Sequence, residues 1–355
     1  MIDIDGSSGE GGGQILRTSL ALSMITGKAF AMRNIRANRA QPGLRRQHSA
    51  CVEVARLLCN GTVHGNTVGS SYLEFTPAAI IGGDHTVDIG SMGSTTLVVQ
   101  TVLVPIISAG IELALVVRGG THNPMAPPFE FLERVYLPCL RAMGAQVELM
   151  LDEHGFVASP GERQGQLGQL TLRVSPSTPA REGAPRLTAN DFVHASSIRT
   201  RRATVLLSRL PTHVGDREIA VIRERLGFDA TECEINELRG AGIANAVSIE
   251  FGREMSGLSI REHITELGEK GVRAELVAAR ACEQAERYLA ADAPVGEHLA
   301  DQLLLPFAVA PGGRFRTGEL SLHATTNIAT IGRFLDVPIE VVPDGEAVIV
   351  SVGAR

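Results

Sequence analysis

The chain has 355 residues, 44% of them hydrophobic, and a formal net charge of −6 at pH 7. It is long enough for two or three packed units, and its hydrophobicity excludes intrinsic disorder. This net negative charge on its own argues against a nucleic-acid partner. Lys28 and Lys270 are the only lysines, so arginine carries nearly all of the positive charge.

The N-terminus and the cysteines indicate a cytoplasmic protein without disulfides. Residues 1–5 lack a basic stretch followed by an apolar one, so we expect no signal peptide. The five cysteines are an odd number and form no CxxC pair. This spacing fits neither a disulfide framework nor a zinc cluster.

The first candidate site is the glycine-rich segment 5–14, which leads into a helix predicted over Gln14–Ile25. Glycines at a helix start allow backbone N–H groups to converge on an anion. The segment lacks both the Lys-Ser/Thr of a Walker A loop and the third glycine of a dinucleotide fingerprint, so a plain turn remains the alternative. Glu10 would repel an anion here unless a divalent metal lay between them. Arg17 lies one helical turn further along and could face the same anion.

The second candidate is the arginine-rich segment 33–48, which holds five arginines, one histidine and no acidic residue. Arginine binds phosphate through two parallel hydrogen bonds and keeps its charge at any relevant pH. A solvated basic surface is the simpler alternative. Because no acidic residue is interspersed, the pattern favours a phosphate-binding loop.

The stretch 95–117 is apolar and long enough to imitate a membrane span. Gln100, Pro105 and Gly110 interrupt it. We therefore predict a buried helix up to about Ser108 and a core strand from Ile111.

A rhythm of βαβαββ recurs along the chain and indicates an α/β fold built from repeated modules. First helices are predicted at 14–25, 94–108, 198–207 and 299–309, and alternating strands at 146–151, 339–342 and 347–352. The region 159–184 is predicted as a loop and domain boundary. After it, residues 187 to about 275 could be a separate inserted module.

Three later segments carry chemistry-bearing residues. The proline-rich segment 121–128 predicts a rigid loop. Asp301 and Gln302 occupy the polar first turn of an apolar helix, for which capping is the simplest explanation. His323 is predicted where a strand over 319–322 meets a helix, whose dipole favours a neutral imidazole, so it is a candidate nucleophile or general base.

Six segments in order resemble the RNA 3′-terminal phosphate cyclase family over essentially the whole chain: DGSSGEGGGQILRTSLALS, RANRAQPGLRRQH, GSMGSTTLVVQTVLVP, GGTHNPMAPP, GEHLADQLLLP and the segment around His323. The resemblance implies an enzyme that uses ATP to convert an RNA 3′-phosphate into a 2′,3′-cyclic phosphodiester. It implies a covalent histidine–AMP, an RNA-3′-pp-5′-A intermediate and release of AMP and pyrophosphate. RNA, ATP and Mg²⁺ or Mn²⁺ are the implied partners, with no obligate protein partner and no membrane.

The resemblance also implies roles for individual residues. His323 matches the nucleophile, and Glu10 matches a metal-associated acid. Further catalytic positions match Arg17, Arg36, Arg39, Gln47 and His48. The nucleotide pocket matches Gln100, Pro127, His298, Leu299, Ala300, Asp301 and Gln302. Many relatives carry tyrosine where this chain has His298, so stacking on adenine would fall to an imidazole.

The fold implied by the resemblance has a large catalytic domain over residues 1–180 and 277–355. Its βαβαββ modules are expected to resemble the C-terminal domain of a translation initiation factor. A smaller α/β domain is inserted over residues 181–276.

Two alternatives stay open at this point. A non-catalytic RNA-binding relative would be expected to lack the nucleophile, which is present as His323. An enolpyruvyl transferase has related modules, but the scarcity of lysine and the arginine loop weigh against it. A lysine-based nucleotidyl transferase is excluded, because neither lysine lies in a Lys-x-Asp-Gly motif. Recognition of an RNA end needs only local positive charge, which the segment 33–48 provides.

Overall fold

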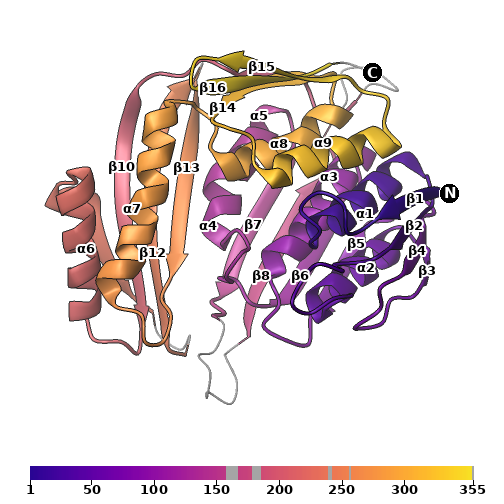
Figure 1. Ribbon diagram of the computed structural model, residues 1–355. Coiled ribbons are helices and arrows are strands. Elements are labelled where there is room, and N and C mark those ends of the chain that lie inside the picture. Colours follow the sequence, from indigo (N-terminus) through magenta and orange to yellow (C-terminus); the bar gives the residue numbers. More distant parts are fainter. Residues whose placement is uncertain (157–166, 178–184, 239–241, 256, 354–355) are drawn as a thin grey trace.

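The computed structural model describes residues 1–156, 167–177, 185–238, 242–255 and 257–353. Within these ranges the strands form four sheets of four strands each. Three sheets and their helices make up one body, and the fourth lies beside it with its own helices (Figure 1). The chain is a mixed α/β protein, as predicted. The likeness to an initiation-factor domain stays a prediction.

The first module has the predicted βαβαββ order. It consists of β1 (Ile2–Asp5), α1 (Gln14–Thr26), β2 (Phe30–Arg33), α2 (Arg46–Leu58), β3 (Thr62–His64) and β4 (Leu73–Thr76). The sheet order is β1-β2-β4-β3, with β1 and β2 parallel. Helix α1 ends at Gly27, whose φ of +70° is a left-handed conformation that glycine adopts freely.

The second module repeats this order. It contains β5 (Gly83–Asp88), α3 (Thr95–Ala109), β6 (Leu113–Gly119), a helical run of α4 (Phe129–Phe131), η1 (Leu132–Tyr136) and α5 (Leu137–Ala142), and then β7 (Gln146–Glu153) and β8 (Gly168–Ser175). The apolar stretch 95–117 is a buried helix and a strand, as predicted. No helix among the described residues is long and apolar enough to span a bilayer.

The predicted loop over 159–184 is wrong in its middle. Residues 168–175 form β8, which lies inside the sheet between β6 and β7. Its alternating Leu170, Leu172 and Val174 are buried, a period-two pattern that the flanking Gly, Pro and Gln residues obscured. Residues 159–166 and 178–184 of that prediction lie outside the described ranges.

The third module is interrupted by the fourth sheet. It consists of β9 (Asn190–Phe192), α8 (Glu297–Val309), β14 (Gly313–Thr317), α9 (Leu322–Phe334), β15 (Ile339–Asp344) and β16 (Ala347–Val352). Strand β9 pairs in parallel with β14, although 120 residues separate them. The two predicted C-terminal strands and both helix positions are confirmed.

The interrupting unit, which we call the insert, is a sheet covered by two helices. It contains β10 (Ile198–Ser208), α6 (His213–Leu226), η2 (Ala230–Glu232), β11 (Cys233–Glu237), β12 (Ala244–Met255), β13 (Leu258–Leu267) and α7 (Ala274–Ala291). The helix predicted at 198–207 is wrong, because Ala203, Val205 and Leu207 alternate into the core as a strand does.

The structure describes the surroundings of only one of the two predicted limits of the inserted domain. The limit at 180/181 lies outside the described residues. The limit at 276/277 falls near the start of α7, which packs against α6, β12 and β13 of the insert. The limits 181–276 remain a prediction.

Packing of the modules sets the position of the site. The first helices α1, α3 and α8 pack together, and α9 packs on α1 and α8. Leu20, Leu103 and Leu303 are fully buried in their shared core. Because of this packing, the N-terminal turns of α1, α8 and α9 meet at one place.

Candidate active site

A cleft of about 1880 Å³ lies between the three-module body and the insert. Every predicted site residue lines it except Leu299 and Ala300. Those two side chains are buried in the core, on the face of α8 that packs inward. The sequence motifs thus converge on one cavity, and the roles predicted for Leu299 and Ala300 could be served only by their backbone.

His323 is the second residue of α9, whose N-terminus is capped by the Ser321 hydroxyl accepting from the Ala324 N–H at 3.1 Å. The helix start is as predicted, but residues 318–321 link β14 to α9 without forming the predicted strand. Nδ1 of His323 is hydrogen-bonded to Oε1 of Gln14. An amide oxygen only accepts, so Nδ1 carries the proton and Nε2 keeps its lone pair.

The surroundings of His323 favour the neutral ring. Burial lowers its pKa, and the nearby Arg17 guanidinium lowers it further, whereas Glu10 opposes both. A neutral imidazole with a free Nε2 is the form that can act as a nucleophile.

A hydrogen-bond network holds this tautomer, and sequence reasoning missed it. The Gln14 amide N–H donates to the carboxylate of Asp301, which also accepts from the Asn327 side chain. Thr18 Oγ1 in turn donates to Oδ1 of Asn327 at 2.6 Å. The sequence signal is only that Gln14 and Thr18 share one helical face, and polar pairs with this spacing are common on helices of every kind.

Asp301 therefore serves inside the network rather than only at the cleft wall. Burial raises its pKa to about 6, although the hydrogen bond from Gln14 and the charge of Arg17 oppose this. A buried carboxylate of this kind is costly unless its oxygens are satisfied. Here the Gln14 and Asn327 amides both donate to Oδ1.

Asp301 is expected to make folding less favourable as the pH rises. Between its ordinary pKa of 3.8 and about 6, the folded chain holds a proton that the unfolded chain has released. The free energy of unfolding therefore falls by up to about 3 kcal/mol across this window. Asp301→Asn removes this titration. The free energy of unfolding of the variant, measured by urea titration and compared with that of the wild type, should therefore rise by this amount between pH 4 and pH 7. A difference that stays constant with pH would contradict the assignment.

The glycine-rich turn holds Glu10 rather than an open anion cradle. The Glu10 N–H donates to Thr326 Oγ1 at 2.9 Å, and the Gly12 N–H donates to Glu10 Oε2 at 2.8 Å. Arg39 forms an ion pair with the same carboxylate. A Cβ at Gly12 would lie 2.1 Å from Glu10 Oε1, so any other residue here would displace the carboxylate from this position.

The donor set suits a metal shared with phosphate, not an all-protein metal centre. No group of three metal-ligating side chains occurs in the part of the chain that the structure describes. Mg²⁺ commonly binds through one or two carboxylates together with substrate phosphates and water. Glu10, at the wall of the cleft beside the arginines, fits such a role.

The arginine loop supplies the positive charge of the cleft. Arg36 is held by the carbonyls of Gln41 and Gly43, at 2.7 and 2.9 Å. Burial and the neighbouring Arg39 lower its pKa, which shows how closely the cations are packed. Arg17 reaches the same cleft from α1. A cluster of this kind is suited to bind phosphate oxygens.

His48 and Gln47 begin helix α2 beside these arginines. Burial, followed by the charge of Arg17, lowers the pKa of His48 to about 3, so its ring is neutral. The Arg45 N–H donates to His48 Nδ1 at 3.1 Å, which places the ring proton on Nε2, facing the turn at Gly13. Oε1 of Gln47 accepts the Ser94 N–H at 3.3 Å.

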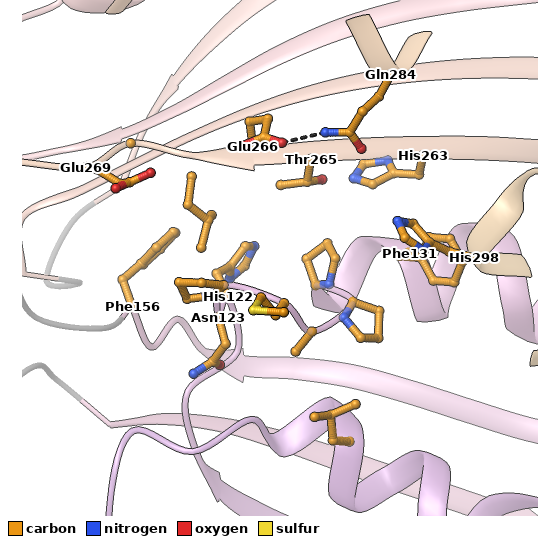
Figure 2. A pocket seen from close by; sticks show the side chains of 18 of the residues that line it. His122, Asn123, Phe131, Phe156, His263, Thr265, Glu266, Glu269, Gln284 and His298 are labelled. Atoms are coloured by element: carbon orange, nitrogen blue, oxygen red, sulfur yellow. Dashed lines mark hydrogen bonds between the residues drawn. The ribbon is translucent and has the colours of Figure 1, made fainter. Parts of the chain in front are cut away.

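One part of the cleft is lined by apolar and aromatic side chains. Gln100, Pro127, Phe131 and His298 line it. The exposed ring of His298 meets Phe131 edge-on, with ring centroids 6.5 Å apart (Figure 2). The Pro127 carbonyl accepts from Thr96 Oγ1 at 2.7 Å, which fixes the proline loop. Apolar and aromatic side chains of this kind are suited to pack against a planar ring system.

The insert contributes a wall that sequence reasoning did not predict. His263, Thr265 and Glu266 of β13 line the cleft opposite Phe131 and His122 (Figure 2). No motif marked them, because alternation along a strand is ordinary for a covered sheet. Only the packing of β13 against α4 and η1 brings them to the site.

Comparison with known proteins identifies the family of this chain. A family model described as RNA 3′-terminal phosphate cyclase matches residues 8–341. A protein of Ectopseudomonas mendocina (strain ymp), named RNA 3′-terminal phosphate cyclase, is 42% identical over 341 residues, which cover 95% of this chain and 94% of that protein. The match includes both the insert and the segments that carry the cleft. The chain belongs to the RNA 3′-terminal phosphate cyclase family.

Proposed function

We propose that this enzyme uses ATP to convert the 3′-phosphate of an RNA end into a 2′,3′-cyclic phosphodiester. Family membership supports the cyclisation of an RNA 3′-phosphate. The observation that carries the rest is the position of His323, a neutral imidazole with a free Nε2 beside a cluster of arginines. A non-catalytic binding protein would have no use for a neutral His323 beside the arginines, so this alternative is not favoured. An enolpyruvyl transferase does not agree with the family to which the chain belongs.

In the first step, Nε2 of His323 attacks the α-phosphorus of ATP. A P–N bond forms, the bond from the α-phosphorus to its bridging oxygen breaks, and pyrophosphate leaves. Arg17, Arg36 and Arg39 would offset the charge that develops on the leaving group. A divalent metal held between Glu10 and the phosphates would supply further charge neutralisation.

In the second step, an oxygen of the RNA 3′-phosphate attacks the histidine-bound phosphorus. The P–N bond breaks, His323 is released, and RNA-3′-pp-5′-A forms. In the third step, the neighbouring 2′-OH attacks the RNA phosphorus, AMP leaves, and the hydroxyl proton passes to solvent. This attack needs no further protein nucleophile, because the two groups share one ribose.

The test compares two RNA oligonucleotides that differ only at the 3′ end. With ATP and Mg²⁺, the 3′-phosphorylated RNA is expected to become resistant to phosphatase, whereas 3′-hydroxyl RNA stays unchanged. Omitting ATP is expected to leave the phosphate sensitive. Resistance that forms without ATP would refute the ATP requirement, and equal behaviour of the two RNA ends would refute the reaction.

A further inference from the structure

The positive charge of the arginine-rich segment 33–48 extends beyond the cleft. Arg36 and Arg39 line the cleft, whereas Arg45 and Arg46 do not. Both of the latter side chains are exposed. They stand at the start of helix α2, directly before two residues that do line the cleft. Arg45 and Arg46 therefore lie at the rim of the cleft.

The charges of these two rim arginines are not offset by a carboxylate. Among the described residues, the ion pairs of this segment are those of Arg33 with Asp3 and of Arg39 with Glu10. The segment itself contains no acidic residue, although the whole chain has a net charge of −6. Two adjacent free cations in an acidic protein form a local surface that attracts an anion.

This surface is continuous with the cleft. Burial lowers the pKa of Arg36, and the charges of Arg39 and Arg45 lower it further, so Arg45 lies within electrostatic range of the cleft wall. Nη1 of Arg46 donates to the Gly90 carbonyl at 2.5 Å, which holds this side chain against the loop between β5 and α3. Figure 1 shows α2 on the side of the body away from the insert. The rim arginines thus extend the positive surface outward along the body.

The size of the two substrates indicates which anion this surface binds. The leaving pyrophosphate of ATP already has Arg17, Arg36 and Arg39 inside the cleft. An RNA strand, in contrast, places only its 3′ end in the cleft, and the rest of the strand has to leave over the rim. Each further nucleotide carries a phosphate, which arginine binds regardless of the base.

We propose that Arg45 and Arg46 bind backbone phosphates of the nucleotides that precede the reacting 3′ end, and so hold the RNA strand at the rim of the cleft. The inference rests on the proposed conversion of an RNA 3′-phosphate. It makes the rim an RNA-binding surface without base preference. It also gives the enzyme a reason to favour a polynucleotide over a single nucleoside 3′-phosphate.

The experiment compares a long and a short ligand by calorimetry. The long one is a 3′-phosphorylated RNA decanucleotide, and the short one is uridine 3′-monophosphate, which carries only the reacting phosphate. When Arg45→Ala and Arg46→Ala are combined, affinity for the decanucleotide is expected to fall at least about tenfold, as loss of two charge-assisted contacts would give. Affinity for uridine 3′-monophosphate and self-labelling with ATP should stay unchanged.

The salt dependence of decanucleotide binding gives a second readout. Each phosphate contact on a single strand contributes about 0.7 to the slope of log affinity against log salt concentration. The slope should therefore become shallower by about 1.4 in the double variant and by about 0.7 in each single variant. The single variants decide the matter if the double variant does not fold. Arg45→Lys with Arg46→Lys, which keeps both charges, should keep most of the slope.

Arg287→Ala is the matched control, because Arg287 is an exposed arginine of α7 outside the cleft. It should bind both ligands like the wild type. An equal loss for both ligands, a loss of ATP affinity, or unchanged decanucleotide binding in the double variant would overturn the proposal. If the wild type binds the decanucleotide through these arginines but does not cyclise it, the proposed function fails and this inference stands.

Discussion

Replacing His323 by alanine is expected to abolish the covalent enzyme–AMP adduct and to slow cyclisation by at least about 1000-fold, as loss of a nucleophile does elsewhere. His48, beside the arginines of the same cleft, cannot take its place, because Nδ1 already accepts the Arg45 N–H and Nε2 carries the proton. The measurement is incubation with α-labelled ATP and Mg²⁺ followed by denaturing electrophoresis. The wild-type label should be acid-labile and stable to alkali, as a phosphoramidate is.

Two further variants separate the nucleophile from other histidines. His64→Ala, at an exposed position in β3, should label like the wild type. His298→Ala should still form the adduct but need more ATP, because it removes an aromatic ring of the cleft wall on which the base would pack. A label that persists in His323→Ala would show that another residue attacks the phosphorus.

Local signals made much of the fold predictable. Helix α1 is bounded by glycines, and the apolar stretch 95–117 is divided by Gly110, which ends α3 with a φ of +65°. Strand β16 is a nearly continuous apolar run over Ala347–Val352 and matches its predicted limits. In each case the residues that define the element are its own neighbours in sequence.

The insert could not be predicted in the same way. Residues 198–207 carry many polar side chains and occupy a first-helix position in the repeated rhythm, which suggested a helix where the strand Ile198–Ser208 lies. Its pairing with β12, residue for residue from Thr200 to Ser208, decides the matter. The paired residues lie 36 positions (Ser208 and Ala244) to 52 positions (Thr200 and Gly252) apart in the chain. The same holds for β9, which is only three residues long and is defined by its pairing with β14.

Some residues of the candidate site could also be predicted from local sequence, whereas others could not. Residues with a rare chemical identity or spacing, such as Glu10 in a glycine turn and His323 at a helix start, could be predicted from the sequence. Gln14 and Asn327 are ordinary polar residues on apolar helices, and they gain a role only when α1, α8 and α9 meet. His263 and Thr265 reach the cleft wall only because β13 of the insert packs against the body.

Gln14→Leu is expected to lower the rate of enzyme–AMP formation about 100-fold while leaving the affinity for ATP nearly unchanged. The side chain holds Nδ1–H of His323 on one side and the Asp301 carboxylate on the other. Without an acceptor at Nδ1, the ring can rotate or shift its proton to Nε2, where it blocks attack. Loss of such an orienting partner costs about 10–100-fold at metal-bound histidines and more where the wrong tautomer results. Single-turnover labelling measures the rate.

Gln169→Leu is a close control for this variant. The Gln169 amide likewise bridges two side chains, since it accepts from Arg118 at 3.0 Å and donates to Asp152 at 3.1 Å, but it lies outside the cleft. Its loss is expected to leave labelling intact. Wild-type labelling by Gln14→Leu would show that the tautomer is held by something other than this amide.

Gln14→Glu keeps a hydrogen-bond acceptor for Nδ1–H of His323 but adds a negative charge beside the ring. The carboxylate still accepts from Nδ1, but its charge next to the imidazole stabilises the protonated ring and raises the pKa of His323. Protonation occupies Nε2, so labelling by the variant should fall away at a higher pH than in the wild type. Nitrogen NMR of ¹⁵N-histidine-labelled protein reports the tautomer directly. We expect an unprotonated Nε2 in the wild type at neutral pH and a mixture of tautomers in Gln14→Leu, a change that a purely structural role for Gln14 would not produce.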